Sequence, residues 1–283
     1  MRLATWNVNS VRSRIDRVEA LLQRHDIDVL ALQETKCKEE QFPTMGLESL
    51  GYEVAAHGFD QWNGVAIVSR IGVEDVERGF EGMPWFGKGD KEPVAEARAL
   101  GATCGGVRVW SLYVPNGRKP DDEHYTYKLD WLRALREQAA GWAAAGPTAL
   151  VGDWNIAPQD SDVFDIRQFA RSTHVTPPER EAFQAFLDSG FSDVVRPILP
   201  GEDIYTYWDY YRNRYVRNRG MRMDYVLAGG GLAERVTGAF IDTDERGGED
   251  GLGKGASDHA PVVVSLDCRA DPHSAVSRSA CLP

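Results

Sequence analysis

Polar side chains gather at the ends of the apolar segments of this 283-residue chain. The stretch "TALVGDWNIAP", residues 148–158, shows the pattern, because an apolar run leads directly into Asp153 and Asn155. A carboxylate or an amide costs free energy when it leaves water, so its place beside a buried strand requires a reason. Five segments share the pattern, and their polar residues are Asn7, Glu34, Asp153, Asn155, Asp224, Asp258 and His259.

This set of side chains predicts chemistry that depends on a hard divalent cation. Carboxylate and amide oxygens suit Mg²⁺ or Mn²⁺, whereas zinc sites draw on cysteines and on several histidines. Such an ion is a common partner of phosphate chemistry, in which a carboxylate activates water and a histidine stabilises the developing negative charge. Each residue alone is more typical of a turn or of the surface, so the prediction rests on the repetition.

The elements that must position these residues are strands mixed with helices. A helix is predicted over residues 121–146, where Gly146 and Pro147 end it, and another from Pro178 to Leu187. A third is predicted over residues 10–25, with Ser10 as its N-cap. Strands are predicted in "RLATWN", "DVLALQE", "YEVAAHG", "NGVAIVSR", "AEARALGAT", "GVRVWSLYVP", "TALVGDWN", "MRMDYVLA" and "APVVVSL". Several strands follow one another directly, which favours a layered α/β sandwich with mixed sheets over a purely parallel doubly wound fold.

Composition is typical of a globular cytoplasmic protein. Hydrophobic residues make up 42% and charged residues 27% of the chain. No run approaches the ~18–20 apolar residues of a membrane span, and the first residues have no apolar signal-peptide core. Four cysteines stand far apart, which favours free thiols; they are Cys37, Cys104, Cys268 and Cys281.

The formal net charge of −11 by itself argues against a nucleic-acid partner, but one segment is basic and aromatic. Residues 205–222, "YTYWDYYRNRYVRNRGMR", contain five arginines and one aspartate. Arginines bind phosphates with two parallel hydrogen bonds, and aromatic rings stack on bases or wedge a duplex open. The alternative is an aromatic core element with a solvated arginine face, and we expect both to apply. The DNA-binding candidates are Tyr207, Trp208, Arg212, Arg217 and Arg219.

Six motifs together resemble the exonuclease III family of abasic-site endonucleases, within the endonuclease/exonuclease/phosphatase superfamily. They run in the family's order from residue 5 to residue 262: "TWNVNSVRSR", "LALQETK", "YVPNG", "GDWNIAP", "NRGMRMDYVLA" and "SDHAPV". The resemblance implies a four-layer α/β sandwich with two central mixed β-sheets flanked by helices. It also implies one catalytic domain over residues 1–267, and we expect a loose C-terminal tail over residues 268–283.

The resemblance implies a metal site as well. Glu34 would be the main ligand of a Mg²⁺ ion, with Mn²⁺ as a substitute, and Asn7 would support the metal or its waters. The remaining metal candidates implied in this way are Asp153, Asn155, Asp258 and His259. Asn9 departs from the pattern, because it stands where the vertebrate branch carries an aspartate, and this leaves open whether one or two ions bind.

Catalytic roles follow from the same resemblance. Asp153 would position and deprotonate the attacking water, while Asn155 would face the phosphate and help to hold that water. His259 would contact the phosphate with Asp224 as its partner. Tyr113 would bind the phosphate or the leaving group, and whether Asp153 or Tyr113 is the base stays open.

On the DNA side, the resemblance implies that Asn116 faces DNA and that the region of Trp208 lies over the extruded sugar. Arg118, just after "YVPNG", is a further candidate for a phosphate contact.

The function expected from these observations is that of a Mg²⁺-dependent DNA repair phosphodiesterase. It would be a monomer that cuts duplex DNA 5′ to an abasic site, resects 3′ ends and removes blocked 3′ ends, with no membrane partner. One alternative is a phosphoinositide phosphatase or sphingomyelinase, which would have no need of the arginine-rich segment. The other is a catalytically silent DNA-binding scaffold, which would have no need of the intact polar set.

Overall fold

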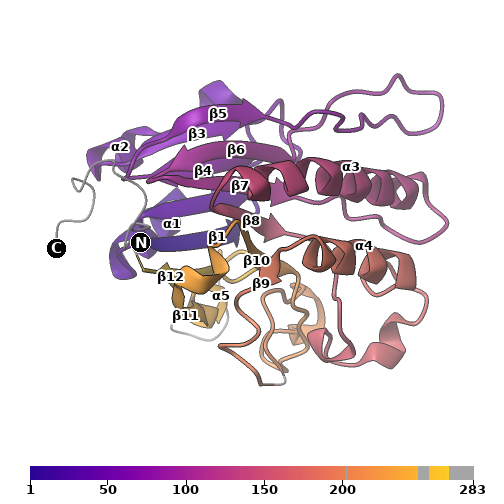
Figure 1. Cartoon of the computed structure of the whole chain (residues 1–283). Coiled ribbons are helices and arrows are strands. Elements are labelled where there is room, and N and C mark those ends of the chain that lie inside the picture. Colours follow the sequence, from indigo (N-terminus) through magenta and orange to yellow (C-terminus); the bar gives the residue numbers. More distant parts are fainter. Residues whose placement is uncertain (202, 248–254, 268–283) are drawn as a thin grey trace.

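Two six-stranded β-sheets form the centre of the structure (Figure 1). The structure is a computed structural model and describes residues 1–201, 203–247 and 255–267. In spatial order the first sheet contains β11 (Val236–Ile241), β12 (Val262–Leu266), β1 (Arg2–Asn7), β2 (Val29–Gln33), β4 (Val65–Ser69) and β3 (Glu53–His57). The second contains β5 (Glu74–Arg78), β6 (Ala99–Cys104), β7 (Val107–Tyr113), β8 (Thr148–Asp153), β10 (Asp224–Gly229) and β9 (Ser192–Asp193).

Each sheet combines parallel and antiparallel pairs. β1 and β2 are parallel in the first sheet, and β7 and β8 are parallel in the second. The other paired strands run antiparallel. The predicted mixed sheets are therefore confirmed.

Helices cover the outer faces of both sheets. α1 (Ile15–Arg24) and α2 (Met45–Ser49) pack on the first sheet through Leu21, Leu22 and Leu47. α3 (Glu123–Ala145) and α4 (Pro177–Asp188) cover the second sheet together, as Figure 1 shows. α5 (Thr243–Gly247) follows β11, and single helical turns occur at Glu39–Gln41, Asp160–Asp162, Ile166–Phe169, Tyr211–Asn213 and Ala233–Arg235. The order of helix, sheet, sheet and helix confirms the four-layer sandwich.

The space between the sheets is filled by aliphatic side chains such as Val29, Val109 and Val264, which are fully buried. Polar groups also join the sheets. Gln33 Nε2 in β2 donates to Ser111 Oγ in β7 over 3.0 Å, and Ser111 Oγ donates to a carbonyl oxygen of β2 over 2.9 Å. Buried polar groups that are paired in this way hold two layers in one relative position.

The predicted start of the first helix is wrong. α1 begins at Ile15, and Ser10 has a φ of +87°, so it is not an N-cap. Residues 8–14 instead form a turn that hydrogen-bonds to the residues after β2, because the N–H groups of Ser10 and Val11 donate to the carbonyl oxygens of Glu34 and Thr35. This turn therefore belongs to the region where β1 and β2 end.

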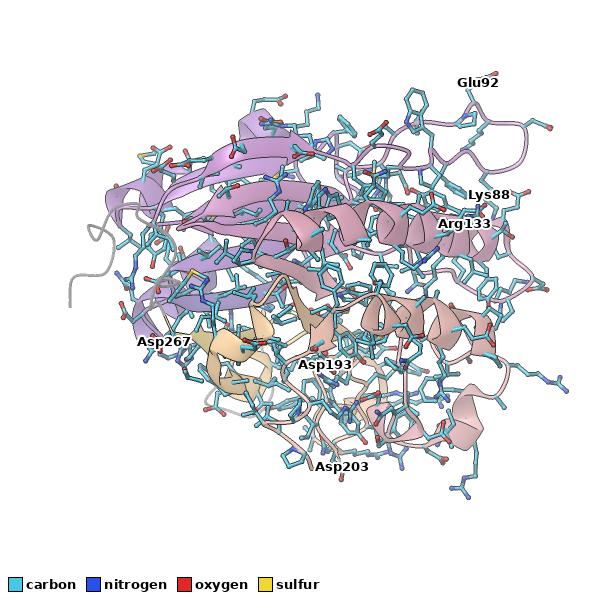
Figure 2. All side chains as sticks on the ribbon, in the orientation of Figure 1. Lys88, Glu92, Arg133, Asp193, Asp203 and Asp267 are labelled. Atoms are coloured by element: carbon cyan, nitrogen blue, oxygen red, sulfur yellow. The ribbon has the colours of Figure 1, made fainter. Side chains whose placement is uncertain are left out.

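The described residues end at Asp267 (Figure 2), so the expected tail over residues 268–283 lies outside them. Among the residues that the structure describes, no helix has the length and apolar character needed to cross a bilayer.

Candidate active site

The candidate site lies where strand ends of the two sheets face each other. In the second sheet, Tyr113 of β7 pairs with Asp153 of β8, and Asp153 pairs with Asp224 of β10. Directly paired residues lie about 5 Å apart, so this register places three polar side chains at one level of the sheet. In the first sheet, Asn7 ends β1 beside Gln33, the last residue of β2. Glu34 follows immediately.

Asn7 joins the two sheets at this point. Its Nδ2 donates to Glu34 Oε1 over 2.8 Å and to Asp153 Oδ2 over 2.9 Å, and its side chain is fully buried. Its Oδ1 accepts the N–H of Asn9 over 3.1 Å. Asn7 therefore orients two carboxylates through its amide nitrogen, while its oxygen, the atom that would bind a metal, already has a partner.

Glu34 is an ionised carboxylate that stays within reach of solvent, with 17% of its side chain exposed. Lys36 Nζ lies 2.8 Å from Glu34 Oε2 and 2.6 Å from Asn9 Oδ1. Burial alone would raise the pKa of Glu34, but the Lys36 charge and the bond from Asn7 outweigh it and lower that pKa. The carboxylate thus holds its negative charge and attracts a cation.

Asp153 is more deeply buried and less acidic. Its Oδ1 accepts the N–H of Asn155 over 2.9 Å, and its Oδ2 lies 3.8 Å from His259 Nε2. Burial raises the pKa of Asp153 to about 7, against the lowering effect of the His259 charge. A carboxyl group with a pKa near neutrality is well suited to take a proton from water.

His259 and Asp224 form a buried pair. His259 Nδ1 lies 2.8 Å from Asp224 Oδ2, and Tyr207 packs on the imidazole with ring centroids 4.9 Å apart. Burial alone would lower the pKa of His259, but the charges of Asp224 and Asp153 outweigh it and raise that pKa to about 10. His259 is therefore an imidazolium at neutral pH, with Nε2 directed toward Asp153.

The oxygen donors of this region fit a divalent metal ion. Ligand atoms of Asp153, Asp224 and His259 lie within 4.8 Å of one another, and Asp224 Oδ1 is buried without a hydrogen-bond partner. A doubly protonated imidazole has no lone pair for a metal, so we do not assign His259 as a ligand. Asp224 is engaged by His259 through Oδ2, so Glu34, Asp153 and the half-buried Asp258 remain as the carboxylate donors predicted from the sequence, which is a set that suits Mg²⁺ or Mn²⁺.

Two asparagines are held by a buried network behind the site. Asn155, with a φ of +50°, accepts a bond from Asn116 Nδ2 over 3.0 Å and donates to a carbonyl oxygen of the "YVPNG" motif over 3.0 Å. Lys128 Nζ in α3 donates to the main-chain oxygens of both asparagines, over 2.6 Å to Asn155 and 3.3 Å to Asn116. Glu179 in α4 pairs with Lys128, and both are fully buried. The outer helices thus fix the backbone that presents these amides.

Tyr113 is half-buried at the end of β7, and the Arg98 guanidinium lies 4.7 Å from its ring centroid. Burial and the neighbouring Glu34 raise the pKa of Tyr113 well above its usual value. A tyrosine that keeps its proton can donate a hydrogen bond to a phosphate but is a poor base. The pKa of Asp153, about 7, therefore suits it better than Tyr113 to the role of base.

The predicted role of Trp208 as a DNA contact does not fit the structure. Its side chain is 2% exposed, lies against Tyr205 and Tyr215, and donates from Nε1 to Asn218 Oδ1 over 3.1 Å. Its backbone N–H donates to the carbonyl oxygen of Asp258 over 2.8 Å. Trp208 is thus a core residue that supports the segment carrying Asp258.

The other DNA-binding candidates fall into two groups. Exposed side chains are those of Asn116, Arg118, Arg212, Arg217 and Arg219. Tyr207 is half-buried against His259. The basic segment also has less free charge than its sequence indicates, because Arg222 is buried and pairs with Asp193 (Figure 2) over 2.7 Å.

A loop on the rim of the site escaped the sequence analysis. Phe59 and Trp62, between β3 and β4, have 53% and 63% of their side chains exposed. The loop is anchored beside Glu34, because Lys36 N–H donates to the carbonyl oxygen of Asn63 over 3.0 Å. The sequence signal that could have identified this loop is Trp62, which lies directly before the turn pair Asn63-Gly64, where a core residue is not expected.

Comparison with known families decides the classification. The model of the endonuclease/exonuclease/phosphatase family matches residues 4–259. The chain belongs to this family. The family predicted from the motifs is therefore confirmed.

Individual relatives match over nearly their whole length. The exodeoxyribonuclease of Bacillus subtilis is 30% identical over 280 residues, which cover 94% of this chain and 100% of the relative. The structure of an AP endonuclease from Archaeoglobus fulgidus has a TM-score of 0.85 at 36% identity and covers 94% of this chain and 99% of its own. The 3′ phosphatase NExo from Neisseria, solved with a product DNA hairpin, has a TM-score of 0.87 at 35% identity, with coverage of 94% and 99%.

Proposed function

We propose that this nuclease of the exodeoxyribonuclease III and AP endonuclease type cuts duplex DNA 5′ to abasic sites, and also trims and cleans 3′ ends. The observation that carries the chemistry is the arrangement of Asp153. It lies between Asn7, which ties it to the anionic Glu34, and the imidazolium of His259. A carboxyl group with a pKa of about 7 beside a fixed positive charge is suited to phosphodiester hydrolysis by water.

Each residue of the site has a distinct role in this proposal. Asp153 takes a proton from the attacking water, and Asn155 orients that water and the phosphate. His259, held protonated by Asp224, donates a hydrogen bond to a non-bridging oxygen as negative charge develops. Tyr113 donates a hydrogen bond on the leaving-group side.

The proposal assigns a divalent metal, Mg²⁺ with Mn²⁺ as a substitute, to the carboxylates of Glu34, Asp153 and Asp258. Bound there, the ion would neutralise phosphate charge and assist departure of the 3′-oxygen. Asn7 would keep two of these carboxylates at a fixed separation.

DNA binding is assigned to the exposed rim. Arg118 and the arginines of residues 212–219 would contact phosphates, and Trp62 would stack on exposed bases or sugars. We further propose a monomer that acts in the cytoplasm on double-stranded DNA. A phosphoinositide phosphatase would need no such rim of arginines and exposed aromatic side chains.

The first experiment uses an end-labelled duplex with one stable abasic analogue, incubated with Mg²⁺ and then with EDTA. We expect a single cut immediately 5′ to the lesion, which EDTA abolishes. A ladder that steps inward from the 3′ end would make exonuclease the main activity. Absence of cleavage with both Mg²⁺ and Mn²⁺, or hydrolysis of a phosphoinositide instead, would contradict the proposal.

Two variants test the roles of the central residues. Asp153→Asn and His259→Ala should each lower the rate of cleavage by about 10³-fold or more, because each removes a group needed in the transition state. Binding of the abasic duplex, measured by fluorescence anisotropy, should stay within about threefold of wild type, which is under 1 kcal/mol. An equal loss of binding and cleavage would contradict these assignments.

A further inference from the structure

Arg14, the residue just before α1, uses every donor of its side chain. Its Nε donates to the carbonyl oxygen of Gly255 over 3.0 Å, and its Nη2 donates to that of Ala256 over 3.0 Å and to Tyr210 Oη over 3.2 Å. Its Nη1 donates to the carbonyl oxygens of Val8, over 3.2 Å, and of Asn9. A guanidinium has five N–H groups, and all five are paired here.

These acceptors belong to three segments that carry the candidate site. Val8 and Asn9 directly follow Asn7 at the end of β1. Gly255 and Ala256 precede Ser257, Asp258 and His259, and Tyr210 belongs to the aromatic, arginine-rich segment. One side chain therefore connects the end of β1 to the approach to His259.

Other contacts show what this connection fixes. Asn9 Nδ2 donates to Asp258 Oδ1 over 3.0 Å, and Ser257 Oγ donates to the carbonyl oxygen of Asn7 over 2.6 Å. Tyr210 Oη also donates to the carbonyl oxygen of Ala256 over 2.7 Å. The Asn9 turn has left-handed backbone geometry, with φ of +45°, which the bonds from Arg14 help to retain.

We propose that Arg14 is a positioning residue, which holds the Gly255–Ser257 segment against the end of β1 and thereby sets where Asp258 and His259 lie. The inference builds on the proposed function, because it concerns the placement of groups assigned to that reaction. Only a planar group with five donors can bridge these segments at once. A lysine has three N–H groups on one nitrogen and would reach one segment, so charge alone would not replace Arg14.

The test compares Arg14→Met and Arg14→Lys with Arg133→Met, a control that removes an exposed arginine from α3 (Figure 2). Hydrogen exchange with Mg²⁺ present, followed by mass spectrometry, is the readout that does not depend on activity. We expect peptides covering residues 255–260 to exchange about tenfold faster or more in both Arg14 variants, while strands of the two sheets keep wild-type exchange. The control should match wild type throughout.

Kinetics on the abasic duplex supply the second readout. We expect kcat of both Arg14 variants to fall about 10- to 100-fold, because small displacements of catalytic groups are costly, with KM within about twofold of wild type. The slope of binding against salt concentration should be unchanged, whereas loss of a phosphate contact would reduce it by about 0.9.

Several outcomes would overturn the inference. Wild-type exchange in residues 255–260 would mean that the other bonds of the segment, from Ser257, Tyr210 and Asn9, hold it without Arg14. Full recovery of kcat by Arg14→Lys would mean that only charge matters. Uniformly faster exchange in both sheets would indicate a general stability role, and a higher KM with a smaller salt slope would indicate a DNA contact. If wild type fails to cleave DNA, the proposed function fails, and the exchange data still decide the role of Arg14.

Discussion

At the scale of single residues, the surroundings of Glu34 and Asp153 give the two carboxyl groups different pKa values. Glu34 is kept acidic by Lys36, whereas burial raises the pKa of Asp153 to about 7. His259 lies beside Asp153 as a fixed positive charge. One carboxylate is therefore suited to a cation and the other to a proton, although both accept a bond from the same amide of Asn7.

Asp224→Asn should reveal how His259 keeps its charge. The aspartate raises the pKa of His259 to about 10, so the amide should let that pKa fall. Because the proposed mechanism needs the protonated form, the variant should lose activity as pH rises through the lowered pKa. We expect kcat to fall about 10²-fold at pH 8.5 and less at pH 6.

The pH dependence of kcat for wild type and variant measures this effect. Profiles of the same shape, shifted only in height, would show that Asp224 does not set the charge of His259.

Among the functional residues, those at strand ends were the most predictable from the sequence. Glu34 and Asp153 end apolar runs, whereas Asp224, Asp258 and His259 precede them, and the structure brings these side chains together. Trp208 could not be judged in that way, since an aromatic ring in a basic segment fits both a core and a DNA contact, and only packing distinguishes them. Arg14 gave no signal either, because four of its five partners are backbone oxygens, which no residue type marks, and the fifth is Tyr210 Oη far along the chain.

At the scale of elements, the outer helices reach into the site. Lys128 in α3 and Glu179 in α4 form a buried pair that holds the carbonyl oxygen of Asn155. His174, before α4, donates to the same oxygen from Nδ1 over 2.6 Å. Most strands and α3 were predictable from periodicity, but β9, with two residues, and β11, which has no fully buried residue, were missed. β5 was not predictable either, since its five residues are all exposed and lack a buried apolar face.

His174 should make stability depend on pH. Burial, together with the Lys128 charge, lowers the pKa of His174 from 6.5 to about 4. The unfolded chain then binds a proton that the folded chain does not, so His174 weakens the fold as pH falls from about 6.5 towards 4. The loss should reach about 2–3 kcal/mol.

Urea unfolding of wild type and His174→Gln across that range tests the effect, because glutamine keeps a donor but cannot be protonated. We expect a flatter curve of unfolding free energy for the variant. Parallel curves for the two proteins would contradict the role of His174.

The loop between β3 and β4 should contribute to DNA affinity. Trp62→Ala should weaken binding of the abasic duplex about tenfold, because stacking on one base contributes about 1–3 kcal/mol. Anisotropy titrations measure this, with Met45→Ala as a control that shortens an exposed apolar side chain on α2. Equal affinity of both variants would remove the loop from the DNA interface.

At the scale of the whole molecule, the mixed sheets were predictable because several strands follow one another directly, and the four layers were predictable from the resemblance to the family. The contact between the two sheets was not predictable, since it depends on pairs such as Gln33 and Ser111 that no local pattern reveals. The site straddles this junction, with Asn7 from one sheet bonded to Asp153 from the other. Neither sheet contains a complete set of groups.

Because the site lies at this junction, its geometry depends on the relative position of the two sheets. A slip between the sheets would break the Asn7–Asp153 bond, so we expect activity to last as long as the two sheets keep their native contact and to be lost with it. Heating should therefore abolish cleavage and the circular dichroism signal of the strands with the same midpoint, within about 2 °C. Inactivation well below the unfolding midpoint would show that the two layers can shift while each stays intact.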